Sequence, residues 1–185
     1  MIEDVEADAA QRMAKSVVAL TDEFRKLRTG RAHTGLLEHV IVEYYGSEVP
    51  ISQAATVAVE DARTLTIAPW DKQMVKAVEK AILTSDLGLT PVTAGTVIRV
   101  PLPPMTEERR KKLVKIVRHE TETGRIAVRN IRRDALGDIK DLLKEKLITE
   151  DEDHRVHEDI QGLTDRAIAE MDELMKKKET EIMEF

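Results

Sequence analysis

The sequence predicts an α+β fold, in which an elongated antiparallel three-helix bundle carries an inserted small β/α/β domain. Three segments have apolar residues at steps of three and four, the spacing typical of amphipathic helices. Between the first and second of these segments, the pattern changes to short runs rich in Val, Thr and Ile, which is typical of strands. The bundle is therefore expected from residues 1–30 and 105–185, and the small domain from residues 31–104.

The first helix is predicted to have one narrow apolar seam. Its apolar positions are Ile2, Val5, Ala9, Met13, Val17, Leu20, Phe24 and Leu27. Arg25, Lys26 and Arg28 are expected in the last turn, where cations suit the helix dipole. Gly30 is the expected C-terminal stop.

The middle of the chain reads as a small mixed unit of strands and one helix. Strands are expected within residues 37–51, with a turn near residues 45–47, and at residues 54–60, 64–68 and 96–100. Helical spacing returns at residues 71–85. Gly88, Pro91 and Gly95 predict a loop before the last strand.

A second helix is expected from about residue 106 to residue 146. The prolines of residues 101–104 favour a stiff, non-helical connector before it, and Thr106 is a plausible N-cap. Gly124 would cost about 1 kcal/mol relative to alanine in an exposed helix, so it predicts either close approach of a neighbouring helix or a kink. The expected buried side is Leu113, Val117, Gly124, Val128, Ile131, Ala135, Ile139 and Leu142.

The third helix is predicted to begin with a capping box formed by Thr149 and Glu152. Its apolar stripe is Val156, Ile160, Leu163, Ala167, Met171, Leu174 and Ile182. Only Leu147 and Ile148 separate it from the second helix, so the two are expected to be antiparallel neighbours.

The insertion of the small domain implies two side-by-side connectors, near residues 28–34 and 100–105. Helices of about 40 residues are about 60 Å long, and neither can bury its stripe alone. Paired connectors resist twisting yet permit bending. The expected shape is therefore two rigid arms set at an angle.

Composition excludes several classes of protein. The chain has no cysteine, which excludes disulfides, zinc–thiolate sites and thiol catalysis. No apolar run approaches the ~20 residues of a membrane span. The acidic N-terminus lacks the basic and apolar regions of a signal peptide, so a cytoplasmic location is expected.

The sequence offers no catalytic constellation and no cofactor site. His154 and His157 are three residues apart, but no third ligand has convincing spacing for a metal. The acidic residues at 150–153 are explained by helix capping. A glycine-rich phosphate loop, a nucleophile elbow and an HExxH motif are all missing.

Charge is strongly segregated along a chain whose net charge is −6. Lys and Arg exceed Asp and Glu by five over residues 106–147, and fall short by eight over residues 148–185. At 100° per residue, the basic residues of one stripe lie within about 60° of each other and about 120° from the apolar seam, so they are expected to face solvent. They are Lys111, Arg118, Arg125, Arg129 and Arg132.

The arginine stripe has two interpretations. Arginine binds phosphates in a fork geometry and stacks on bases, which favours an RNA contact. Alternatively, the stripe pairs with the acidic third helix, although surface pairs contribute only ~0–1 kcal/mol each. The pattern leaves both open, and the Arg109–Arg110 pair near the prolines shares the ambiguity.

Six sequence blocks resemble the ribosome recycling factor family, in order along the whole chain. They are RTGRA at 28–32, VEYYG at 42–46, SDLGL at 85–89, IRVPLPP at 98–104, TEERRK at 106–111 and AVRNIRRD at 127–134. The resemblance implies a two-domain, L-shaped molecule of transfer-RNA dimensions. It also implies a non-enzymatic, cofactor-free and monomeric factor that binds the large ribosomal subunit after termination. With elongation factor G and GTP, such a factor splits the ribosome into subunits.

The resemblance also implies which residues act. By the resemblance, contacts to large-subunit ribosomal RNA are expected at arginines of the TEERRK and VRNIRRD motifs, and weaker contacts at the two arginines of RTGRA. These residues are Arg110, Arg129, Arg132 and Arg133, and then Arg28 and Arg31. The hinge residues of the two connectors are expected, by the same resemblance, to be Gly30, Ala32, His33, Pro101, Pro103 and Pro104. One departure is His33–Thr34, where many members have a small polar residue followed by proline, and it bears on the stiffness of this connector.

A protein of another class remains as the rival. A helical adaptor would bind protein partners through the acidic third helix. Ribosome sedimentation separates the two hypotheses, because only a recycling factor co-migrates with the large subunit.

Overall fold

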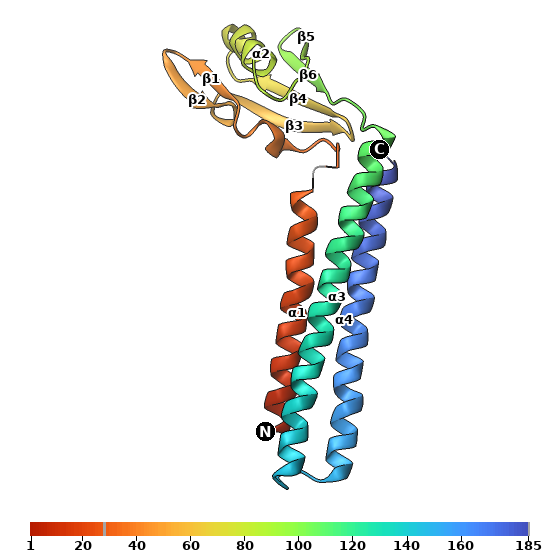
Figure 1. Cartoon of the computed structure of the whole chain (residues 1–185). Helices are drawn as coiled ribbons and strands as arrows, with labels where there is room; N and C mark the ends of the chain where they lie inside the picture. The colour runs from red at the N-terminus through yellow and green to blue at the C-terminus, as the bar shows by residue number, and fades with distance from the viewer. Residues whose placement is uncertain (28, 185) are drawn as a thin grey trace. The chain divides into compact units, whose positions relative to one another are not determined.

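The computed structural model describes residues 1–27 and 29–184 of the chain (Figure 1). These residues form two compact units with separate cores. One unit joins residues 1–27 to Glu107–Glu184, and the other is residues 29–106. These limits lie close to, but not at, the boundaries expected from the sequence.

The first unit is a bundle of three helices. They are α1 (Ile2–Lys26), α3 (Glu107–Lys144) and α4 (Glu150–Glu184). Within this bundle α1 and α4 run in the same direction and α3 runs opposite to both (Figure 1). Each helix packs against the other two, so the three apolar seams close one elongated core.

The first helix ends earlier than its sequence predicts. Leu27 is extended, and its N–H donates to the Phe24 carbonyl at 3.2 Å, so the helix stops at Lys26 and not at Gly30. Gly30 has φ of +79°, and a Cβ there would lie 2.9 Å from Cγ of Met105. Glycine is therefore favoured at position 30 for two reasons. The backbone there is left-handed, and a side chain would clash with Met105 of the small unit.

Gly124 lies where neighbouring helices approach α3 closely. A Cβ at this position would lie 3.1 Å from Sδ of Met171 and 4.0 Å from Cδ2 of Leu20. The α-helix continues unbroken through the glycine. Close approach of the neighbouring helices, and not a kink, is thus the reason for glycine here.

Two threonines lie in the bundle core where the sequence pattern favoured other residues. Thr121 and Thr164 are fully buried, while the predicted seam residues Gly124, Leu142, Leu163 and Leu174 are only half-buried. The Thr121 hydroxyl donates to the Val117 carbonyl at 2.7 Å, and that of Thr164 to the Ile160 carbonyl at 2.9 Å. Because each hydroxyl is satisfied within its own helix, the threonine methyl group can pack in the core as an apolar group.

The turn from α3 to α4 is held by backbone and side-chain caps. The Leu147 N–H donates to the Leu142 carbonyl and the Lys146 N–H to the Leu143 carbonyl, which is a Schellman motif with Lys146 at φ +59°. The predicted capping box is confirmed. The Thr149 N–H donates to Glu152 Oε2 at 2.8 Å, and the Glu152 N–H donates to Thr149 Oγ1 at 3.2 Å.

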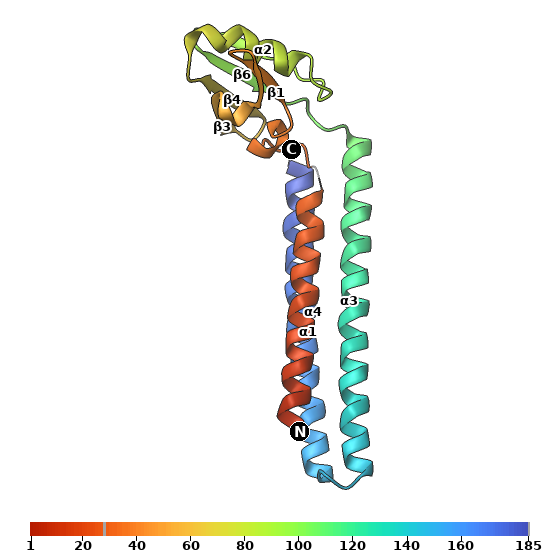
Figure 2. The ribbon, with the colours of Figure 1, turned by 90° about the vertical axis from the view of Figure 1, so that its left-hand side faces the viewer.

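The second unit combines a hairpin, a four-stranded antiparallel sheet and one helix. The sheet has the order β3-β4-β6-β5, and β1 pairs only with β2. The strands are β1 (Ile41–Tyr44), β2 (Ser47–Pro50), β3 (Ala55–Asp61), β4 (Thr64–Pro69), β5 (Val92–Ala94) and β6 (Val97–Pro101). Helix α2 (Val75–Leu83) lies on one face of the sheet (Figure 2).

The hairpin turn lies where the sequence predicts it. Tyr45 and Gly46 both have positive φ, which is the type I′ geometry that suits a two-residue hairpin loop. Leu37, however, belongs to a 3₁₀ turn (Thr34–Leu37) and not to the first strand. The expected helix at 71–85 begins with a 3₁₀ turn (Lys72–Met74), which the Asp71 side chain caps.

Strand β5 was expected to be a loop. Its three residues are all exposed, so the sequence lacks the alternation of buried and exposed positions that would predict a strand. Backbone pairing with β6 alone defines it.

No helix in the part of the chain that the structure describes is long and apolar enough to cross a membrane.

The core of the small unit lies between α2 and the sheet. Val78 and Ile82 of α2 are fully buried, as are Leu65 and Ile67 of β4. Ile98 and Val100 of β6 complete this layer. The unit thus has its own apolar interior.

Candidate RNA-binding surface on α3

Two arginines of the predicted stripe pair with carboxylates of α4. Arg118 Nε lies 2.6 Å from Glu179 Oε1, and Arg125 Nε lies 2.9 Å from Asp172 Oδ1. Seven residues forward along α3 correspond to seven residues back along α4. The two pairs therefore follow one antiparallel register, and the scaffolding interpretation holds for both arginines.

Arg125 does not face solvent as predicted. Only 20% of its side chain is exposed, because it lies across the groove toward Asp172. Glu122 provides a second partner, 2.9 Å from Nη1 of Arg125. A helical wheel measures the direction of a Cβ, and a side chain as long as arginine can turn back onto a neighbouring helix.

Arg129 lies on the outer side of the same cluster. Its Nη1 is 3.1 Å from Glu122 Oε1, and 45% of the side chain is exposed. Hydrogen bonds from Arg125 and then Arg129 lower the pKa of Glu122 below its usual value. The Glu122 carboxylate is thus shared by two guanidinium groups, and Arg129 is the more exposed of the two.

Arg132 and Arg133 differ from the arginines before them. Arg132 is half-buried, and its Nη1 donates to the side-chain oxygen of Gln161 at 3.0 Å. Within residues 1–27 and 29–184, neither Arg132 nor Arg133 forms an ion pair, and Arg133 is exposed. Among the described residues, no carboxylate therefore compensates the charge of either arginine.

Arg110 and Lys111 have partners inside the bundle. Arg110 is half-buried and its Nη1 donates to the Met183 carbonyl at 2.8 Å, close to the end of α4. This bond satisfies one of the carbonyls that a helix C-terminus leaves free. Lys111 Nζ lies 2.7 Å from Glu107 Oε1 within its own helix.

The remaining predicted residues lie in or beside the small unit. Arg28 is outside the described residues, and Arg31 is exposed. The Ala32 N–H donates to the Ala62 carbonyl at 2.8 Å, and His33 Nδ1 accepts from the Gly35 N–H at 2.9 Å.

The second connector is also held in part by the small unit. Pro101 lies in β6 opposite Thr64, and the Leu102 N–H donates to the Arg63 carbonyl at 2.7 Å. Pro103 and Pro104 lie outside any helix or strand.

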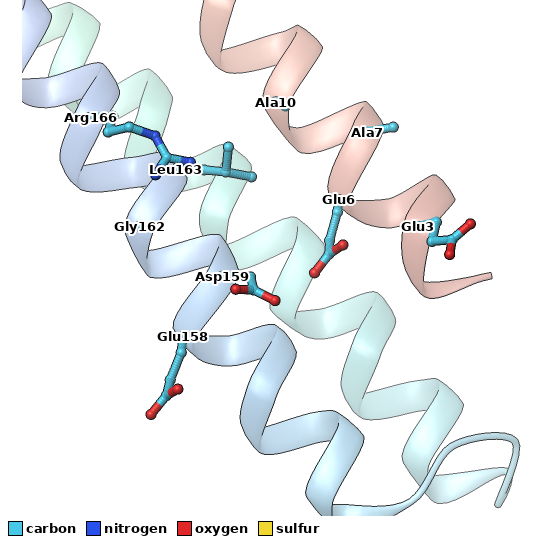
Figure 3. Close-up of a pocket in the computed structure, with 9 residues that line it drawn as sticks. All are labelled: Glu3, Glu6, Ala7, Ala10, Glu158, Asp159, Gly162, Leu163 and Arg166. Carbon is cyan, nitrogen blue, oxygen red and sulfur yellow. The ribbon is translucent and has the colours of Figure 1, made fainter.

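An acidic groove lies between α1 and α4 (Figure 3). Glu6 and Asp159 point into it from opposite helices, and Glu3 and Glu158 add further negative charge. Burial, followed by the charge of Asp159, raises the pKa of Glu6. Such a groove repels phosphate, so the sites for a polyanion are restricted to other faces of the bundle.

Candidate metal ligands do not converge. His154 lies 3.6 Å from Glu158 and His157 lies 3.6 Å from Asp153, each pair within a single turn of α4. Among the described residues no group of three or more such side chains could hold a metal ion.

These features define a class of protein: a long helical bundle with a small α/β unit, displaying uncompensated arginines on one helix. The model of the Ribosome recycling factor family matches residues 20–183. The chain is 60% identical to the ribosome-recycling factor of Halorhodospira halophila over 184 residues, which covers 100% of both chains. It is 55% identical to the ribosome-recycling factor of Legionella pneumophila strain Paris over 185 residues, again with full coverage of both.

Solved structures agree. A solution structure of the ribosome recycling factor matches with a TM-score of 0.67 and 46% identity, covering 100% of this chain and 98% of that one. A second match, with a TM-score of 0.59, 48% identity and 98% coverage of both chains, comes from models of a Thermus thermophilus factor. Its title describes the T. thermophilus ribosome recycling factor and the E. coli elongation factor G bound to the E. coli post-termination complex. The chain belongs to the ribosome recycling factor family, as its sequence blocks predict.

Proposed function

We propose that this chain binds the large ribosomal subunit of post-termination complexes through α3. With elongation factor G and GTP, it then splits the ribosome into subunits, so that mRNA and tRNA are released. Family membership supports this function, as does the relative whose title places it with elongation factor G on a post-termination complex. The chain contributes binding and mechanical work in the cytoplasm as a monomer, and GTP hydrolysis belongs to its partner.

The observation that carries the RNA contact is the change of partner along α3. Arg118 and Arg125 meet carboxylates, whereas Arg132 meets a neutral amide and Arg133 is exposed. A guanidinium that keeps its charge can bind a phosphate without first breaking an ion pair. Arg132 and Arg133 meet this condition and are proposed as the main contacts to ribosomal RNA. Arg129 is proposed to join them, because its side chain is 45% exposed and its partner Glu122 also pairs with Arg125.

Other predicted residues have subordinate roles in the proposal. Arg110 contributes at the end of the bundle, where one of its nitrogens already caps α4. Arg28 and Arg31 are proposed to add weaker contacts. Bending is proposed within the two connectors, beside the parts that the small unit already holds.

A long bundle suits this function because bending it would separate packed seams. The α3 helix has 38 residues, so it is about 57 Å long at 1.5 Å per residue. Force applied to the small unit can thus be transmitted to the RNA contacts without being absorbed by the bundle.

The test is charge reversal at Arg132. Arg132→Glu is expected to weaken large-subunit binding in sedimentation assays by at least tenfold, because a phosphate contact becomes a repulsion. Thermal melting should change little, since the side chain has one hydrogen bond to the described residues and lies outside the core. Subunit splitting with elongation factor G and GTP should fall in parallel.

Lys15→Glu provides the matched control. Lys15 is exposed on α1 and has no side-chain partner within the described residues, and its reversal changes the net charge equally. Wild-type binding by Arg132→Glu would refute the arginine assignment. Equal losses in both variants would point to overall charge instead of a site.

A further inference from the structure

The α3–α4 seam has a regular register that is broken at one position. Arg118 pairs with Glu179 and Arg125 with Asp172, seven residues apart on each helix. The next step of the register brings Arg132 opposite Asp165. Both residues are present and both are described, yet they form no ion pair.

Gln161 occupies the space between the two groups. Its side-chain oxygen accepts from Arg132 Nη1 at 3.0 Å, and its side-chain nitrogen donates to Asp165 Oδ1 at 2.8 Å. A guanidinium can only donate and a carboxylate can only accept, so this is the one orientation of the amide that satisfies both. Gln161 thus holds the arginine in place and keeps the carboxylate occupied.

We propose that Gln161 is a positioning residue: by preventing an ion pair between Arg132 and Asp165, it leaves the charge of Arg132 uncompensated and its guanidinium aimed for ribosomal RNA. The proposal rests on the proposed function, in which Arg132 contacts phosphate. A neutral partner orients the guanidinium without neutralising it. A carboxylate partner would compete directly with the phosphate for the same N–H groups.

The arginines one and two heptads away show what happens without such an amide. Arg125 turns back to Asp172 and leaves only 20% of its side chain exposed. Arg118 contacts Glu179 directly at 2.6 Å. Removal of the Gln161 amide is therefore expected to draw Arg132 to Asp165 by the same geometry.

The first variants remove or charge the amide. Gln161→Ala is expected to weaken large-subunit binding by about threefold to fivefold, the upper part of the range for an exposed ion pair. Gln161→Glu should weaken it at least as much, because a carboxylate then contacts Arg132 directly. The slope of log affinity against log salt should become shallower by about one phosphate contact in both.

A second substitution separates this role from a merely structural one. Asp165→Asn in the Gln161→Ala background removes the competing carboxylate, so binding and the salt slope should return to wild-type values. Melting temperatures should stay within a few degrees throughout, because Gln161 and Asp165 are both exposed. Gln11→Ala, an exposed glutamine on α1, is the matched control and should bind like wild type.

The outcomes distinguish the two proposals. If Arg132→Glu loses binding while Gln161→Ala retains it, the positioning role is refuted and the arginine contact stands. Failure of the Asp165→Asn substitution to restore binding would also refute the positioning role. If Arg132→Glu binds like wild type, the arginine contact itself fails.

Discussion

At the scale of single residues, the partner across the helix seam decides what each arginine does. Arg125 is bound by two carboxylates and has a structural role, whereas Arg133 is exposed with its charge free among the described residues. Arg132 lies between these cases, because its partner is the neutral amide of Gln161 and not a carboxylate. The net charge of a helix therefore says little about which of its cations can bind RNA.

The acidic groove permits a prediction about pH. Burial and the charge of Asp159 raise the folded-state pKa of Glu6 above 4.5, its ordinary value. A raised carboxyl pKa contributes stability below the unfolded pKa, and this stability is lost as pH rises through the folded pKa. Glu6→Gln is therefore expected to raise the melting temperature near neutral pH, where the carboxylate opposes Asp159.

Thermal melts across the acid range provide the measurement. The advantage of Glu6→Gln should shrink as pH falls and should vanish once Glu6 is protonated in both states. Glu3→Gln is the control. Glu3 lines the same groove, and its charge raises the Glu6 pKa less than that of Asp159 does, so this variant should show a smaller change. A gain that is constant with pH would show that ionisation of Glu6 is not the cause.

At the scale of secondary-structure elements, the packing of α3 against its neighbours limits which residues fit in this helix. Two glycines, Gly124 and Gly137, lie within this helix. Among the described residues, only Gly124 has side-chain atoms of other helices within 4 Å of the position that a Cβ would take. A Cβ at Gly124 would meet the buried Met171, while one at Gly137 would meet nothing within 4 Å. The same residue type is thus required at one position and dispensable at the other.

Alanine at the two positions should have opposite effects. Gly137→Ala is expected to stabilise the protein by about 1 kcal/mol, since alanine loses less backbone entropy in a helix. Gly124→Ala is expected to lower the melting temperature, because its Cβ would lie 3.1 Å from Sδ of a methionine that is 0% exposed. Thermal or urea unfolding of the two variants checks this, and equal stabilisation of both would contradict the close approach.

At the scale of the whole molecule, the separation of charge reconciles an acidic protein with a polyanionic partner. The chain has a net charge of −6, but the Lys and Arg residues of α3 outnumber its acidic residues. Acidic residues gather instead on α4 and in the groove beside α1. Local charge at the contact, not the sum, governs binding to phosphate.

This arrangement predicts steep salt dependence. Affinity for the large subunit should fall linearly with salt on a log–log plot, by a slope of about 0.7–0.9 for each phosphate contact. Sedimentation or filter binding over a series of potassium concentrations measures it. A flat response would favour a bundle whose arginines serve only as scaffolding.

Local features of the fold were largely predictable. The capping box at Thr149 and the turn at Tyr45–Gly46 depend on residues adjacent in sequence, and both lie where expected. Strand β5 was missed because three exposed residues carry no periodicity. Thr121 and Thr164 were missed because their hydroxyls count as polar until a carbonyl of the same helix satisfies them.

The sequence by itself determined the helices, the inserted small unit and, through its motif blocks, the family. These depend on spacing, capping and residue type, which are properties of short segments. Only the tertiary structure decided which arginines are paired, because that depends on the antiparallel register of α3 against α4. Arg118, Arg125 and Arg132 are equivalent by spacing along one helix, and a single amide on the other helix makes Arg132 different.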